Sequence, residues 1–171
     1  MSAKRKKNAQ PREGLFNLLT GESDRGTVLV AGEACSELLA SMLERLFIEH
    51  PDVQELLGGA SGVLGTFSAR TRVCFALGLI SKDERDDLQT IREMRNDAAH
   101  FRDGNVFSFA HDRTCDRCRS LRAKSPSYMA RVETELGMRG EFIGKFIALH
   151  MALSTRRDAI RKAETPAEGR R

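Results

Sequence analysis

Residues 22–49 read ESDRGTVLVAGEACSELLASMLERLFIE and contain the strongest structural signal in the chain. Their apolar positions recur in steps of three and four residues, the spacing that aligns side chains on one face of an α-helix. These positions are Val28, Ala31, Cys35, Leu38, Leu39, Met42, Leu43, Leu46 and Phe47. Because Pro51 restricts His50 to extended conformations, we expect this helix to end near Glu49. The stretch therefore predicts a long amphipathic helix at the centre of the fold.

Further helices are predicted on the C-terminal side of this one and just before it. Residues 81–84 read SKDE, which fits a capping box, so a second major helix is expected from about Lys82 to Ala99. Weaker helical patterns are expected over residues 13–19, 68–77, 107–121, 126–137 and 141–160. Four glycines in residues 58–66 predict a loop. Since no segment alternates with the two-residue period of a strand, the predicted fold class is all-α, a single compact bundle of six or seven helices.

The net charge of +4 is distributed unevenly along the chain. Residues 13–154 hold 17 basic and 21 acidic groups, which is unlike the positive field of a protein that reads duplex DNA. We expect a disordered basic tail at residues 1–12, one helical domain at 13–162 and a disordered tail at 163–171. Such short ends are more often solvated termini than binding arms. If the first tail does bind nucleic acid, its candidate contacts are Lys4, Arg5, Lys6 and Lys7.

The apolar runs of the chain are short. The longest, such as residues 28–31, fall far below the roughly 20 residues that a membrane-spanning helix needs. The basic start of the chain is followed by polar residues where a signal peptide would have its apolar core. We therefore expect a cytoplasmic protein with no transmembrane helix and no membrane partner.

The four cysteines are expected to be reduced in that compartment. Cys35 and Cys74 lie in apolar runs, which predicts that they are core residues. Cys115 and Cys118 form a single C-x-x-C, and His111 could add a third ligand on the same helix. A structural zinc site needs a fourth ligand, so neither a metal nor another cofactor is expected.

Arg95 is the polar exception on the apolar face of the second predicted helix. On a helical wheel it lies between Leu88 and Ile91, which directs its guanidinium at a core or an interface, where it needs a partner. One interpretation is a structural ion pair with Glu22 or Asp24, which begin the long helix. The other is an interface arginine or one that binds phosphate.

His100 follows Arg95 by five residues. On a regular helix the two side chains would stand about 140° apart, so they could share one phosphate only at an unwound helix end or with help from a second chain. An arginine that stabilises charge and a histidine that moves a proton are what metal-independent RNA cleavage by the 2′-hydroxyl requires. A histidine at the end of a helix more often caps its last carbonyls.

Residues 112–124 form the most basic predicted helix, with five basic and two acidic side chains. The cations are spread around the helix rather than aligned, which favours a solvated face over a helix that reads a DNA groove. They are Arg113, Arg117, Arg119, Arg122 and Lys124.

Four blocks of the sequence occur in a recognisable order: residues 22–26 (ESDRG), 64–70 (LGTFSAR), 76–81 (ALGLIS) and 91–100 (IREMRNDAAH), with a weaker continuation over 109–121. Together they resemble the mannitol operon repressor (MtlR) family. The resemblance implies an all-helical cytoplasmic regulator of sugar-alcohol uptake genes with no known catalytic activity. The family more typically has Phe-Ala-His where this chain reads Ala-Ala-His, so we expect the packing beneath the histidine to differ.

Because the predicted domain is not basic, we expect this regulator to act mainly through a protein partner or as a homodimer. Its association with DNA is then expected to be indirect or assisted by the basic tail.

Residues 95–100 also resemble the R-x-x-x-x-H signature of HEPN domains, helical bundles whose active members are dimeric ribonucleases. This resemblance implies that Arg95 stabilises the phosphate, that His100 acts as acid or base, and that Asn96 is a polar neighbour. The alternative function is therefore a metal-independent ribonuclease, the only case in which RNA is a partner.

Overall fold

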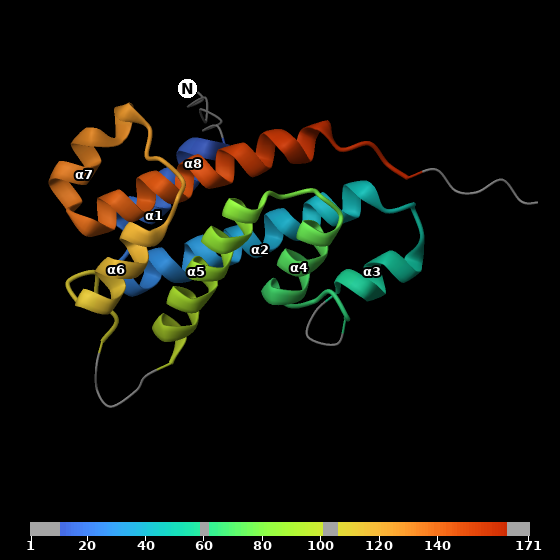
Figure 1. Cartoon of the computed structure of the whole chain (residues 1–171), viewed down its shortest axis with the longest axis horizontal. Coiled ribbons are helices and arrows are strands. Elements are labelled where there is room, and N and C mark those ends of the chain that lie inside the picture. Colours follow the sequence, from blue (N-terminus) through green and yellow to red (C-terminus); the bar gives the residue numbers. More distant parts are fainter. Residues whose placement is uncertain (1–10, 59–61, 101–105, 164–171) are drawn as a thin grey trace, which may run out of the picture.

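The structure is a computed structural model that describes residues 11–58, 62–100 and 106–163, without the side chains of residues 11–13. Within these ranges the chain forms eight α-helices and one 3-10 turn, and no strand (Figure 1). In chain order they are α1 (Pro11–Gly21), α2 (Asp24–Leu46), α3 (Pro51–Leu57), α4 (Phe67–Ala76), α5 (Lys82–Ala99), α6 (Asp112–Ser120), η1 (Ser127–Met129), α7 (Ala130–Leu136) and α8 (Met138–Ala159). The predicted all-α class is confirmed.

The number of helices is one higher than expected because α3 was not predicted. Pro51 occupies the first turn of α3, where its missing N–H costs nothing, and the His50 side chain accepts a hydrogen bond from the backbone N–H of Asp52. Helix α2 ends at Leu46, before the expected end near Glu49, so Pro51 begins a short helix without being the residue that ends α2. A second correction concerns α6, which begins at Asp112 rather than near residue 107.

The main helix boundaries follow local capping chemistry. Ser81 and Glu84 form the expected capping box at the start of α5. At the start of α2, the Ser23 hydroxyl accepts a hydrogen bond from the backbone N–H of Gly26 at 3.1 Å. At the N-terminal end of the described chain, α1 begins at Pro11, two residues before the expected domain boundary. The expected tails lie almost wholly outside the described residues.

Helix α2 runs through the middle of the molecule, with α8 alongside it (Figure 1). It packs against α4, α5 and α8 and also contacts α1 and α3. By length and composition alone α2 could cross a membrane, contrary to the expectation from the sequence, but 56% of its most apolar window is buried inside the protein. Its apolar residues are therefore used to form the core.

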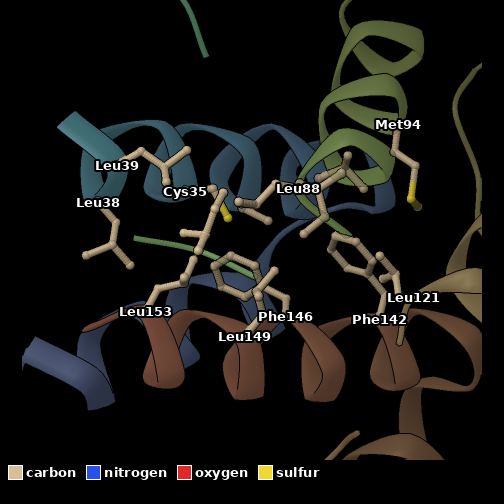
Figure 2. Close-up of a cluster of buried hydrophobic side chains, with 14 of the residues drawn as sticks. Cys35, Leu38, Leu39, Leu88, Met94, Leu121, Phe142, Phe146, Leu149 and Leu153 are labelled. Atoms are coloured by element: carbon tan, nitrogen blue, oxygen red, sulfur yellow. The ribbon is translucent and has the colours of Figure 1, made fainter. Parts of the chain in front are cut away.

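The core lies mainly between α2, α5 and α8. Figure 2 shows side chains from these helices meeting in one layer, among them Cys35, Leu38, Leu88, Phe146 and Leu153. Aromatic rings extend this layer along α8: the rings of Phe142 and Phe146 stack at 6.4 Å, and the ring of Phe109 lies 5.3 Å from that of Phe142. The predicted core positions Cys35 and Cys74 are both fully buried.

Close packing of α7 against α8 depends on glycine. A Cβ atom added at Gly140 would lie 2.4 Å from the carbonyl oxygen of Val132 and 2.7 Å from the Cα atom of Glu133. Because both atoms belong to the backbone, neither can move aside cheaply. Gly140 therefore sets how near α7 approaches.

Two polar side chains attach loops to the helical core. Arg70 donates to the carbonyls of Leu57, Leu64 and Ser36 and to the Ser36 hydroxyl. Asp87 is 3% exposed and accepts the backbone N–H groups of Arg122 and Ala123 at 2.8 and 2.9 Å. In both cases a buried or half-buried polar group finds most of its hydrogen-bond partners in backbone atoms at helix ends and in connecting segments.

The central role of α2 can be tested at Leu38, which is 4% exposed. We expect Leu38→Asp to abolish folding, because an unpaired buried carboxylate together with the lost packing costs several kcal/mol against a total stability of about 5–15 kcal/mol. Far-ultraviolet circular dichroism with urea titration would show no cooperative transition. The matched control is Leu18→Asp on α1, where the leucine is 48% exposed, and it should unfold nearly as the natural chain does. A cooperative, natural-like transition for Leu38→Asp would contradict this description of the core.

Candidate interaction surfaces

Arg95, Asn96 and His100 lie at the C-terminal end of α5. Arg95 and His100 are exposed and Asn96 is half-buried. The Arg95 guanidinium donates to Asn96 Oδ1 at 3.4 Å. His100 has already left the helical conformation, with φ −96° and ψ 118°, and its backbone N–H donates to the carbonyl of Asn96. Among the described residues no hydrogen bond joins Arg95 to His100, so the structure brings Arg95 to Asn96 but does not assemble all three.

The side chain of Arg95 only partly follows the expectation from the helical wheel. Its stem does lie on the packed side of α5, because a Cβ atom added at Gly32 of α2 would come within 2.8 Å of Arg95 Cγ. Of the two expected destinations of the guanidinium, the core is excluded because the residue is exposed, and an interface stays a prediction. A wheel gives the direction in which a side chain leaves the helix, whereas a long arginine can carry its charge past the neighbouring helix into water.

The expected ion pair between Arg95 and the start of α2 is not formed. Asp24 instead pairs with Arg139 of α8 at 3.6 Å and accepts hydrogen bonds at 3.0 Å from the Ser108 hydroxyl and the Phe109 backbone N–H. Glu22 contributes its backbone carbonyl, which accepts from Arg139 at 2.7 Å. The partners lie more than 80 residues away along the chain, so no local pattern could have identified them.

The arginines of α6 and of the turn after it are all held by carboxylates. Most of these carboxylates line one side of α5, here called the acidic edge, which consists of Asp83, Asp86, Glu93 and Asp97. The ion pairs are Arg113–Asp97, Arg117–Glu93, Arg117–Asp97, Arg119–Asp116, Arg122–Asp83 and Arg122–Asp86. The most basic helix is thus largely neutralised by the chain itself.

The pKa shifts agree with this pairing. A hydrogen bond from the Arg85 guanidinium holds the pKa of Asp86 below its usual value, and the charges of Arg85 and Arg122 act in the same direction. A hydrogen bond to Asp83, followed by the charge of that carboxylate, raises the pKa of Arg122. Both groups therefore remain ionised at neutral pH.

The two close cysteines do not face a common site. The Cys115 thiol donates to the Phe109 carbonyl at 3.0 Å, and the Cys118 thiol donates to the Met138 carbonyl at 3.7 Å. Burial raises the pKa of Cys118 to about 12, so its thiol stays protonated. Within the described part of the chain, no group of three or more His, Cys, Asp or Glu side chains could hold a metal ion.

The outer side of α2 carries the acidic face, which consists of Glu33, Glu37 and Glu44. All three are exposed, and their spacing of four and seven residues places them on one side of the helix. Glu44 accepts a hydrogen bond from the Gln54 amide at 2.9 Å. None of the three forms an ion pair with a described residue, in contrast to the acidic edge of α5. This surface is not among the features predicted from the sequence, although the regular spacing of the three glutamates is present there.

The charged side chains of the folded domain thus differ from helix to helix in whether they are paired. The tail residues Lys4, Arg5, Lys6 and Lys7 lie outside the described residues, so they stay a prediction. The described residues form an acidic face on α2 and an exposed, polar end of α5. The arginines of α6 are engaged in ion pairs within the domain.

The ion pair of Asp24 with Arg139, found in place of the expected pair with Arg95, leads to a prediction about stability. Asp24→Ala should lower the free energy of unfolding by about 2 kcal/mol, because it removes a charged acceptor from two hydrogen bonds and leaves Arg139 with one partner fewer. Arg95→Ala should cost less than about 1 kcal/mol, since its charge is exposed. Urea denaturation at neutral pH measures both, with Asp52→Ala at the exposed start of α3 as the control. A larger loss for Arg95→Ala than for Asp24→Ala would contradict the pairing described above.

Comparison with known proteins places the chain in a family. The family model described as mannitol repressor matches residues 18–161. The mannitol operon repressors of Escherichia coli strain K12 and strain O6:H1 are each 28% identical to this chain over 103 residues, which is 57% of this chain and 51% of theirs. The chain thus spans about half the length of the curated relatives it matches.

Two solved structures share the fold. The MtlR subunit in the X-ray structure of the MtlR–HPr complex from Escherichia coli has a TM-score of 0.66 and 21% identity, covering 84% of this chain and 98% of that one. A possible transcriptional regulator, YggD from Shigella flexneri 2a, has a TM-score of 0.61 and 17% identity, covering 90% and 99%. With the family match over most of its length, this chain belongs to the mannitol repressor family.

Proposed function

We propose that the chain is a cytoplasmic transcriptional regulator of the mannitol-repressor type that acts mainly by binding a protein partner. The observation that carries this proposal is the neutralisation of α6: each arginine of the most basic helix, and Arg122 just beyond it, is already paired with a carboxylate. A helix in that state has little positive charge left for DNA phosphates. Association with DNA is then indirect or assisted by the basic tail at residues 1–12.

The acidic face of α2 supports a protein partner. Its carboxylates are exposed and form no ion pair within the described residues, so they can pair with cations of another protein without first breaking an ion pair of their own. The Escherichia coli relative was crystallised in a complex with HPr. We infer that HPr from the same organism is a partner of this chain as well. A second copy of the chain is the alternative partner, and sedimentation velocity of the isolated protein distinguishes the two.

Binding of HPr can be measured by isothermal titration calorimetry with the full chain. We expect saturable one-to-one binding that weakens at least about tenfold in Glu37→Lys, because this change reverses a charge at the centre of the acidic face. The matched control is Glu135→Lys on α7, which makes the same charge change elsewhere and should bind within about twofold of the natural chain. Absence of heat with the natural chain at high protein concentration would reject HPr as the partner. Equal weakening by both variants would reject the acidic face.

The ribonuclease alternative has one observation in its favour. Arg95 is exposed and forms no ion pair within the described residues, and His100, five residues further along the chain, is exposed as well, so each side chain is accessible to a phosphate. The structure leaves their roles as acid, base or phosphate stabiliser a hypothesis.

The regulator proposal predicts that purified protein in EDTA cleaves no RNA at any pH between about 5 and 8, the range in which an ordinary histidine changes charge. Gel analysis of a labelled single-stranded RNA provides the measurement. Cleavage that disappears in His100→Ala, with an unchanged melting temperature, would establish the ribonuclease instead. His111→Ala is the control, because His111 is also an exposed histidine beside a helix end.

A further inference from the structure

A groove opens where the C-terminal end of α2 meets the start of α3, and it continues the acidic face because Glu44 belongs to both. Its volume is about 390 Å³. The segment that follows α8 contributes to the lining, and Figure 1 shows this segment passing the end of α2. This groove, here called the α2–α3 groove, is lined by residues that include Glu44, Ile48, Glu49, Val53, Gln54 and Lys162.

The lining of the α2–α3 groove combines apolar surface with carboxylates. Val53 is 8% exposed and Ile48 is half-buried, so both present part of an aliphatic side chain to the groove. Glu44 and Glu49 are exposed carboxylates, and the Gln54 amide donates to Glu44 Oε1 at 2.9 Å. A lysine or arginine side chain has the matching construction, because its aliphatic stem can lie on apolar surface while its charged head reaches a carboxylate.

The charge around the α2–α3 groove is negative. Residues 44–55 contain four carboxylates, one histidine and one arginine, and that arginine, Arg45, pairs with Asp158 of α8 at 3.7 Å. The neighbouring segment after α8 adds Arg161 and Lys162, which are fewer than the four carboxylates. The groove also lies at the C-terminal end of α2, where the helix dipole favours a cation. The local electrostatics therefore favour a cationic side chain of a partner over an anionic one.

The protein itself already places one cation in the α2–α3 groove. After α8 the chain crosses the end of α2, where the backbone N–H of Ala163 donates to the Leu46 carbonyl at 2.8 Å. The preceding residue, Lys162, lines the groove, and its Nζ donates to Glu49 Oε2 at 3.1 Å. The Lys162 and Glu49 side chains are 49% and 93% exposed, and ion pairs as exposed as this contribute little to stability. A cation of another protein can therefore replace Lys162 on Glu49 at little cost.

We propose that the α2–α3 groove binds one lysine or arginine side chain of the protein partner, and that this side chain displaces Lys162 from Glu49. The partner's aliphatic stem lies against Ile48 and Val53, and its charged head pairs with the carboxylates of the groove. Lys162 is then a competitor built into the chain, and it lowers the affinity for the partner. The inference rests on the proposed function and adds to it the kind of side chain that is recognised, the site that takes it and the contact that opposes it.

Titration calorimetry of the full chain with HPr tests the displacement. Lys162→Ala should bind HPr at least about threefold more tightly than the natural chain, because Glu49 is freed, whereas Glu49→Gln should bind at least about threefold more weakly. In the Glu49→Gln background, Lys162→Ala should no longer strengthen binding, since the two residues act through one contact. Lys124→Ala, which removes an exposed lysine after α6, is the matched control and should stay within about 1.5-fold of the natural affinity. Unchanged or weaker binding by Lys162→Ala would overturn the proposal.

A second measurement without HPr separates this proposal from the identity of the partner. The probe is Nα-acetyl-argininamide, added to the ¹⁵N-labelled full chain and followed by NMR. The side-chain amide signals of Gln54 should shift, because this amide is bound to Glu44 of the groove, and they should shift further in Lys162→Ala. The signals of Gln89, whose amide is bound to Glu93 on α5 at the same distance of 2.9 Å, are the control and should not move.

The two measurements fail in different ways. A shift at Gln54 in a chain that does not bind HPr would keep the groove and reject HPr as the partner. Binding of HPr that neither Lys162→Ala nor Glu49→Gln alters would keep HPr and reject the groove. Absence of any shift at Gln54, or an equal shift at Gln89, would overturn the groove as a site for cationic side chains.

Discussion

Burial of the central helix α2 is the constraint on which the remaining structure depends. Its apolar side chains, from Val28 to Leu43, are shielded from water only because α1, α4, α5 and α8 pack around it. Transfer of this surface from water is the largest favourable contribution to folding that the chain has, and it requires helices from both halves of the sequence. The same requirement leaves a single solvent-facing side on α2, and that side carries Glu33, Glu37 and Glu44.

Polar side chains then attach the connecting segments to this core. Asp24 binds the segment before α6, Asp87 binds the turn after α6, and Arg70 binds the loop that precedes α4. Each supplies hydrogen bonds to backbone groups that regular helices leave unsatisfied. Two of these residues lie in blocks by which the chain resembles mannitol repressors, residues 22–26 and 64–70. Those blocks are therefore explained by structure, without assigning them a catalytic role.

Most of the charge of helix α5 is used within the domain. Its acidic edge holds Arg113, Arg117 and Arg122. A count of charges along the sequence suggests that α6 is the basic element of the protein, whereas in three dimensions each arginine of α6 is paired with a carboxylate. The carboxylates of the acidic face on α2 form no such ion pairs among the described residues.

Local sequence alone determined the all-α class, the extent of α5, the central position of α2 and the burial of Cys35 and Cys74. These features follow from helical periodicity and capping, which act over three or four residues and can be read directly. It did not reveal α3, which begins at Pro51, the earlier end of α2 at Leu46, or the later start of α6. Only the tertiary structure decided that Asp24 pairs with Arg139, that Arg95 reaches solvent past Gly32, and that the arginines of α6 are neutralised. Those outcomes depend on contacts between residues 20 to more than 100 positions apart, which become neighbours only when the buried surfaces of the helices meet.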